Sequence, residues 1–325
     1  MRKLLFLTFI TFSTLLSTKA QSNKPSYKIS GEVVGLQDST VMLAYYFGGK
    51  QYAIDTATVI NGKFTFEGSR EIKGGMYLII FKNQKYFDIV VSERKFSFST
   101  KFSNLIGDMT FVNSKENTAF YKYLKFITQM QKEVAPLRAQ IKNATGEEKK
   151  KLEEKSSLIN KKVNTFQTQF LKEQPNVFFS KVLKATNEIS IPEAPLDSTG
   201  KPDESFRFRY YKAHFFDNMD FTDPRMLRTP IFFNKMDKYL EKLTVKSPDS
   251  IIVSADYLIE KARANAEIFQ YIVSYITSTY ERSKIMGMDA VFVHMVENYY
   301  ITKQCDWIDA AQLEKIVERA KKISP

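Results

Sequence analysis

The chain has 325 residues, a single cysteine and a formal net charge of +12. Its hydrophobic share of 43% is typical of a globular protein and excludes general disorder. Because Cys305 is the one cysteine, no internal disulfide can form, and stability has to come from buried apolar surface. The basic residues are scattered among acidic ones, which favours a solvated positive surface. We therefore expect no nucleic acid among the partners.

The first twenty residues have the order of a secretory signal peptide. Two basic residues precede an apolar run from Leu4 to Leu16, and small residues follow at Thr18 and Ala20. The apolar run is too short to anchor the chain in a bilayer. We predict a signal peptide over residues 1–20 and an exported protein of the periplasm or cell envelope. The mature chain has no predicted transmembrane helix, and association with a membrane surface stays open.

Short alternating strands dominate residues 21–112. The predicted strands cover residues 27–33, 40–47, 52–60, 76–81, 86–91 and 96–100, with one more after the pair Asn61-Gly62. Asn-Gly is typical of a type I′ turn, because both central residues of that turn need a positive φ. Roughly seven strands at this spacing predict an antiparallel β-sandwich for residues 21–112.

The apolar period changes from strand to helix at Asn113, and we expect Asn113 or Ser114 to cap the first helix. Apolar residues recur at steps of three and four from residue 123 to 141, and a matching stripe covers residues 152–170. We predict an antiparallel helical hairpin whose apolar seams face each other, with a kink or break at Pro136. An exposed amphipathic groove for a partner is the alternative interpretation.

Helical patterns continue to the end of the chain. After an irregular stretch at residues 189–201, the predicted helices cover residues 204–217, 230–243, 249–264, 266–281, 284–299 and 309–323. Residues 113–325 are therefore predicted to form an all-α domain. The fold class is α+β, with an N-terminal sandwich followed by helices.

Sequence motifs for catalysis or metal binding are missing. His214 and His294 have no partner at metal-ligand spacing, so we interpret both as structural. Asp217, Asp220 and Asp223 lack the alternation and central glycine of a calcium loop, which favours capping and turn roles. We predict no metal and no cofactor. Carboxylates that meet only in space keep a hydrolase as a weak alternative.

Aromatic residues flank the first long turn of the β region. Tyr45, Tyr46 and Tyr52 could stack on sugar rings or bind a peptide, although such residues also build sandwich cores. We take these three tyrosines, together with His214, as the candidate ligand surface.

Two sets of segments resemble known domains. Residues 29–33, 40–43, 54–57 and 61–66 follow the order of an uncharacterised β-rich N-terminal domain common in exported proteins of Bacteroidetes-type bacteria. Residues 212–218, 223–230 and 286–292 resemble a second, helical uncharacterised domain that often follows it. The segment 223–230 reads Asp-Pro-Arg-Met-Leu-Arg-Thr-Pro.

The resemblance implies a link to redox chemistry. In that family the two domains commonly precede a thioredoxin-like domain of the peroxiredoxin or thiol–disulfide oxidoreductase type, whose Cys-x-x-Cys pair is catalytic. This sequence has no such pair, and Cys305 does not match one, so no redox residue is carried over. The resemblance implies either the N-terminal portion of a longer oxidoreductase or a form that lost the catalytic domain.

Our functional hypothesis is a non-catalytic accessory region of a thiol–disulfide oxidoreductase that positions or selects client proteins. The alternative is a free-standing binding or scaffold protein for a peptide or a glycan, and a hydrolase is the weaker one. The chain itself is not expected to be an enzyme.

Overall fold

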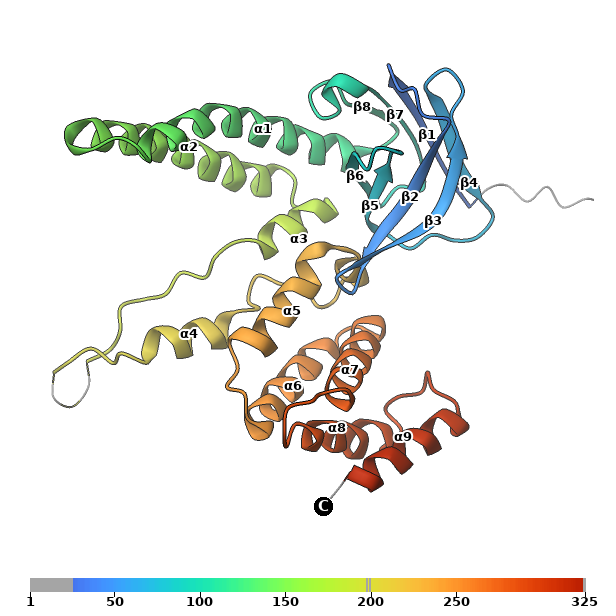
Figure 1. The fold of residues 1–325 in the computed structure, drawn as a ribbon, viewed down its shortest axis with the longest axis vertical. Helices are drawn as coiled ribbons and strands as arrows, with labels where there is room; N and C mark the ends of the chain where they lie inside the picture. The colour runs from blue at the N-terminus through green and yellow to red at the C-terminus, as the bar shows by residue number, and fades with distance from the viewer. Residues whose placement is uncertain (1–25, 197, 199, 324–325) are drawn as a thin grey trace, which may run out of the picture.

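The computed structural model describes residues 26–196, 198 and 200–323. The predicted signal peptide lies outside these residues. Figure 1 shows a β-sandwich at one end and a helical body at the other, with a long helical hairpin projecting sideways from beside the sandwich. The predicted α+β class is confirmed.

Two four-stranded sheets form the sandwich in the described part of the chain. The strands are β1 (Tyr27–Val34), β2 (Thr40–Phe47), β3 (Lys50–Thr58), β4 (Lys63–Gly68), β5 (Gly75–Ile80), β6 (Tyr86–Val91), β7 (Lys95–Lys101) and β8 (Thr110–Val112). One sheet has the order β4-β1-β7-β8, and the other has the order β3-β2-β5-β6. The pairings are antiparallel as predicted, except that β1 and β7 run parallel. Strand β8 was not predicted.

The predicted type I′ turn at Asn61-Gly62 is confirmed, with φ values of 52° and 75°. It joins β3 of one sheet to β4 of the other, and Ile60 pairs with Lys63 across the turn. The N–H of Val33 donates to the carbonyl of Gly62 over 2.8 Å. A Cβ at Gly62 would lie 2.7 Å from the carbonyl oxygen of Val33, so glycine is required both by the backbone angle and by the space.

Most of the helices follow the predicted ranges, but the helix at residues 178–185 was not predicted. They are α1 (Lys115–Ile141), α2 (Gly146–Glu173), α3 (Phe178–Ala185), α4 (Phe206–His214), α5 (Pro230–Lys242), α6 (Pro248–Ala262), α7 (Ala266–Glu281), α8 (Asp289–Met295) and α9 (Ala310–Ile323). Two 3-10 turns, η1 (Phe102–Asn104) and η2 (Pro224–Arg228), and a π turn, η3 (Val296–Tyr300), complete the described elements. The helix predicted from residue 284 begins only at Asp289.

Helices α1 and α2 form the predicted antiparallel hairpin. Met130 and Val134 of α1 and Ile159 of α2 are buried in one cluster, and the rings of Phe126 and Phe166 stack 3.9 Å apart. The seams therefore face each other, as expected. Helix α1 continues through Pro136 without a break.

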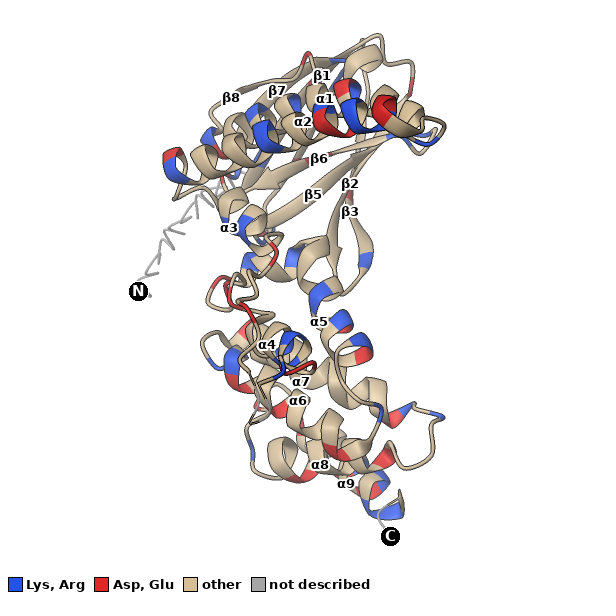
Figure 2. Cartoon of the chain, turned by 90° about the vertical axis from the view of Figure 1, so that its left-hand side faces the viewer, with Lys and Arg blue, Asp and Glu red and all other residues tan. Residues whose placement is uncertain are grey.

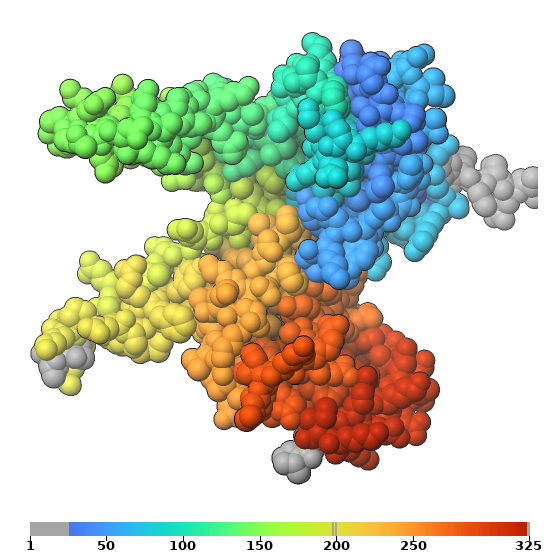
Figure 3. Space-filling view, viewed as in Figure 1, coloured from blue at the N-terminus to red at the C-terminus, as the bar shows by residue number. Residues whose placement is uncertain are grey.

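The hairpin and the segment around α4 project from the same side of the molecule, with an open gap between them (Figure 3). Along the helices, Lys and Arg lie interspersed with Asp and Glu (Figure 2).

The start of α1 is fixed to the edge of the sandwich. The hydroxyl of Ser114 caps the helix by accepting the N–H of Asn117 over 3.1 Å. The buried Asn117 amide accepts the N–H of Val90 and donates to its carbonyl, both over 2.7 Å. This side chain therefore satisfies backbone groups at the β6 edge as a further strand would.

Glu116, which precedes this asparagine, has a role that the sequence does not indicate. Its two carboxylate oxygens accept the N–H groups of Phe178 and Phe179, each over 2.8 Å. These are the first residues of α3, so Glu116 caps a second helix, where a carboxylate complements the helix dipole. Burial raises the pKa of Glu116, although the two backbone hydrogen bonds oppose that effect.

The segment 223–228, which we call the interdomain lock, joins the sandwich to the helices. Arg225 donates to Ser92 of the sandwich over 3.0 Å and to Asp223 over 2.6 and 2.9 Å. Its guanidinium also lies 4.5 Å from the ring centre of Phe178 in α3. Lys181 of α3 donates to the same Asp223 over 2.9 Å. One arginine thus contacts three parts of the fold.

Two glycines allow the interdomain lock to approach the sandwich. A Cβ on Gly74 would lie 2.8 Å from Cδ of Arg225, and a Cβ on Gly75 would lie 2.3 Å from Cβ of Arg228. Gly75 also has a φ of +145°, which side chains rarely allow. A larger residue at either position would push the two parts of the molecule apart.

We predict that Asn117→Ala lowers the free energy of unfolding by about 3 kcal/mol, because it leaves the buried N–H and carbonyl of Val90 without partners. Urea titration followed by circular dichroism measures this loss. The matched control is Asn160→Ala at an exposed position of α2, which should change stability by less than about 0.5 kcal/mol. Equal stability of the two variants would contradict the role of Asn117.

Asp223 should make the stability of the protein depend on pH in acid. Burial alone would raise the pKa of Asp223, but hydrogen bonds from Arg225 and Lys181 outweigh it and lower the pKa from 3.8 to about 2. The folded pKa is below the unfolded one, so the stabilisation is present above pH 3.8 and is lost as the pH falls towards 2. Asp223→Asn should therefore cost about 2 kcal/mol at neutral pH.

The stability of Asp223→Asn should also depend less on pH in that acid window than the stability of the wild type. Urea titrations at a series of pH values measure both effects. Glu154→Gln, which removes an exposed carboxylate of α2, is the control and should leave neutral-pH stability within about 0.5 kcal/mol of wild type. Parallel pH profiles for wild type and Asp223→Asn would show that Asp223 has no such role.

Candidate functional site

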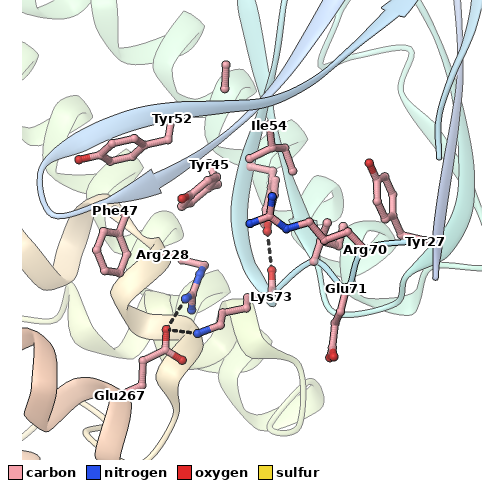
Figure 4. A pocket seen from close by; sticks show the side chains of 13 residues that line it. Tyr27, Tyr45, Phe47, Tyr52, Ile54, Arg70, Glu71, Lys73, Arg228 and Glu267 are labelled. Atoms are coloured by element: carbon pink, nitrogen blue, oxygen red, sulfur yellow. Dashed lines mark hydrogen bonds and ion pairs between the residues drawn. The ribbon is translucent and has the colours of Figure 1, made fainter. Parts of the chain in front are cut away.

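A pocket of about 580 Å³ lies where the β2–β3 hairpin meets the helical body (Figure 4). Its walls are aromatic residues of the sandwich and residues 70–73 of the loop between β4 and β5. Arg228 of the interdomain lock and Glu267 of α7 close it on the helical side. The site is therefore built by both halves of the fold, and we call it the interdomain cleft.

The aromatic wall comes from the pairing of β2 with β3. Tyr45 lies directly opposite Tyr52 in the register, and their rings stack 5.7 Å apart. Tyr77 of β5 packs 5.8 Å from Tyr45 and donates its hydroxyl to the carbonyl of Lys73 over 2.5 Å. These contacts fix the rings, so the wall is formed before any ligand arrives.

A β-bulge changes how β3 contributes to the cleft. Leu43 pairs with Asp55 and Ala44 pairs with Ala53, which leaves Ile54 without a partner across the strands. In a regular strand neighbouring side chains point to opposite faces. The bulge interrupts that alternation, so Tyr52, Ala53 and Ile54 all line the cleft.

The charged side of the cleft centres on Glu267. Its carboxylate accepts hydrogen bonds from Lys73 over 2.9 Å and from Arg228. Burial would raise the pKa of Glu267, but these two partners lower it. Glu267 is therefore ionised at neutral pH and holds the largely buried Arg228, whose side chain is 7% exposed.

Arg70 differs from the other charged residues of the cleft. Its neighbour Glu71 pairs with Arg94, and Figure 4 shows the Glu71 carboxylate pointing away from the other side chains. Arg70 instead extends towards the middle of the cleft. Within the described residues, Arg70 has no ion pair or hydrogen bond.

A second hollow, of about 770 Å³, lies on the polar face of the β4-β1-β7-β8 sheet. Serine and threonine residues form much of its lining, and its two charged residues, Glu32 and Lys63, pair with each other over 3.6 Å. It presents no converging charges, which favours the interdomain cleft as the functional site.

The structure separates the four residues predicted as a ligand surface. Tyr45 and Tyr52 line the interdomain cleft together. Tyr46 does not, because it faces the other way and donates to Asp88 over 3.0 Å. His214 lies on α4, where it stacks 4.1 Å from Tyr210 and contacts Asp217 over 2.7 Å.

Sequence reasoning missed Arg70, Arg228 and Glu267 as residues of the site. For Arg228 a signal was present, because it lies within the resembling segment 223–230.

The aspartates of residues 217–223 form hydrogen bonds and ion pairs within the chain. Asp223 caps η2 by accepting the N–H of Arg225, and Asp220 accepts the N–H of Thr222, so the predicted capping and turn roles are confirmed for these two residues, whereas Asp217 contacts His214. In the searched, described part of the chain, no group of three acidic, histidine or cysteine residues is placed to hold a metal ion. The helices described here are each too short or too polar to cross a membrane.

Comparison with protein families assigns both halves of the chain. A family model described as "Domain of unknown function (DUF5106)" matches residues 144–323, more than half of the chain. The chain belongs to the DUF5106 family. A second model, "Domain of unknown function (DUF4369)", matches residues 27–120. No curated protein and no solved structure matches the chain.

The two matches meet at the interdomain cleft. Tyr45, Tyr52 and Arg70 lie in the DUF4369 part, whereas Arg228 and Glu267 lie in the DUF5106 part. Two uncharacterised domains, one β-rich and one helical, were expected, and both are present. The interdomain cleft of this DUF5106 protein is therefore formed by the contact between the two domains.

Cys305 is 5% exposed. Burial, and to a smaller extent the negative charge of Asp306, raises the pKa of the Cys305 thiol to about 12. We predict that an aromatic disulfide reagent labels this thiol slowly in the folded protein and rapidly in denaturant, because only the exposed thiolate reacts. Ser157→Cys, at an exposed position of α2, adds a thiol that should react fast in the folded protein and serves as the control. Equally fast labelling of Cys305 in the folded and denatured protein would contradict the prediction.

Proposed function

We propose that this DUF5106 protein is a non-catalytic binding region that holds extended segments of client proteins in its interdomain cleft. The clients are substrates of an exported thiol–disulfide oxidoreductase whose dithiol lies outside these 325 residues. The observation that carries the proposal is the exposed edge strand β3 beside the aromatic wall of the cleft.

Strand β3 is suited to bind a peptide backbone. It lies at the edge of its sheet and pairs with β2 alone among the described strands. Most of its residues are exposed, including Tyr52 at 42% and Ile54 at 40%. An exposed edge has free N–H and C=O groups, and an extended segment can add to it as a further strand.

The cleft next to this edge gives the bound segment a place for its side chains. Every second side chain of an extended peptide points to the same face. The rings of Tyr45 and Tyr52 offer apolar and aromatic contact there, and the charged residues around Glu267 form the opposite wall. Backbone pairing would supply general affinity, and the cleft would supply selectivity.

The chemistry of the cleft favours binding over catalysis. A glycosidase needs one carboxylic acid that is protonated at neutral pH. The pKa of Glu267 is lowered instead, and Glu71 is held by Arg94. Cys305 is buried with a raised pKa, so it is a poor nucleophile. We therefore favour a binding role over the hydrolase alternative.

The exported location and the redox partner rest on sequence resemblance. The signal-peptide pattern of residues 1–20 and the resemblance of the two domains to those that precede thioredoxin-like domains both support them. Disulfides form in extracytoplasmic compartments, where clients pass through extended states before they are oxidised. A region that holds such states beside a dithiol would raise their local concentration.

A glycan is the second candidate ligand, because Tyr45 and Tyr52 could stack on a sugar ring. The unpaired strand edge favours the peptide, since a sugar makes no use of a row of backbone groups.

The test is an array of short peptides with random sequences, run beside a glycan array. We expect the wild type to bind a subset of the peptides and Tyr52→Ser to bind them about tenfold or more weakly, because an aromatic contact is lost. The matched control is Tyr86→Ser, which changes an exposed tyrosine of β6 outside the cleft and should leave binding unchanged.

Two results would overturn the proposal. One is the absence of peptide binding above background, with or without glycan binding. The other is peptide binding that Tyr52→Ser leaves intact.

A further inference from the structure

We infer that Arg70 makes the interdomain cleft selective for client segments that carry an acidic side chain, through an ion pair between its guanidinium and that carboxylate. This inference rests on the proposed function and names the class of segment that the cleft takes.

The cleft carries more positive than negative charge. Three cations line it, namely Arg70, Lys73 and Arg228, together with two carboxylates. The carboxylate of Glu267 forms ion pairs with both Lys73 and Arg228, so it is not a partner of Arg70. Glu71 is paired with Arg94, which does not line the cleft. Of these three cations, Arg70 alone has no ion-pair partner in the described chain.

Strand β3 supplies no ion-pair partner for Arg70 in the described structure. Asp55 is the carboxylate that β3 places next to the cleft-lining residue Ile54. One of its oxygens accepts the hydroxyl of Tyr27 over 2.9 Å, and the other accepts the N–H of Thr56 over 2.8 Å. Asp55 is thus held in place by its own hydrogen bonds, and no ion pair joins it to Arg70 in the described structure.

The guanidinium of Arg70 is suited to bind a carboxylate. Arginine presents a planar fork of N–H donors that matches a carboxylate, and such charge-assisted pairs are stronger than neutral hydrogen bonds. Figure 4 shows the Arg70 side chain on the same side of β3 as Tyr45 and Ile54. A segment on the β3 edge could therefore reach the aromatic wall and Arg70 at once.

The spacing within the bound segment follows from strand geometry. Side chains two positions apart in an extended segment share a face. We therefore expect an aromatic or large apolar residue to contact Tyr45 and Tyr52, and an aspartate or glutamate two positions away to pair with Arg70. The pattern is aromatic-x-acidic in either chain direction.

The test uses pairs of peptides taken from the sequences that bind in the array. Members of a pair differ only in glutamate or glutamine two positions from an aromatic residue, and both ends are blocked so that no terminal charge contributes. Fluorescence anisotropy measures the dissociation constants. We expect the wild type to prefer glutamate by about tenfold, and this preference to shrink as salt is added.

Arg70→Gln should abolish the preference, so that the two members of a pair bind with equal affinity. Arg207→Gln, at an exposed position of α4 outside the cleft, is the matched control and should keep the preference. A third peptide, with glutamine at the tested position and a free C-terminal carboxylate, separates a side-chain carboxylate from a chain end.

The inference is overturned if the wild type binds both members of a pair equally, or if Arg70→Gln retains the preference. It is also overturned if only the peptide with the free C-terminus gains from Arg70. In these cases peptide binding that depends on Tyr52 would persist, so the proposed function would stand. Loss of all peptide binding is the different result that would refute the proposed function itself.

Discussion

The guanidinium of Arg225 is the group on which the arrangement of this molecule depends. It reaches Ser92 of the sandwich, Asp223 of its own turn and the ring of Phe178 in α3. The carboxylate of Asp223 is 6% exposed, and a buried charge is costly unless it is paired and hydrogen-bonded, so the half-buried Arg225 has to stay beside it. The same short turn carries Arg228 into the interdomain cleft. The segment that joins the two halves of the fold therefore also forms part of the site.

The cleft consequently belongs to neither matched domain alone. Its aromatic wall comes from the DUF4369 part, and Glu267 and Arg228 come from the DUF5106 part. A ligand that contacts both walls would bind only the docked arrangement and would stabilise it by mass action. Gly74 and Gly75 keep the two halves close enough for this, since a Cβ at either position would collide with the interdomain lock.

The sequence allowed most elements to be predicted, because alternation and helical spacing are local properties. The alternation in β2 even implies that Tyr45 and Tyr46 face opposite ways, a point that our grouping of the tyrosines overlooked. The parallel pairing of β1 with β7 and the bulge at Ile54 depend on contacts between distant segments. Arg70, Arg228 and Glu267 were missed for the same reason, because segments far apart in the sequence bring them to the cleft.

The most direct test of this account is differential scanning calorimetry of the wild type and of the double variant Arg225→Ala with Arg228→Ala. Arg319→Ala, which removes the exposed partner of an ion pair between α9 and Glu281 of α7, is the matched control. The account predicts one cooperative transition for wild type and control, and two separate transitions for the double variant as the sandwich and the helical body unfold independently. A double variant that unfolds in a single transition at the wild-type temperature would contradict it.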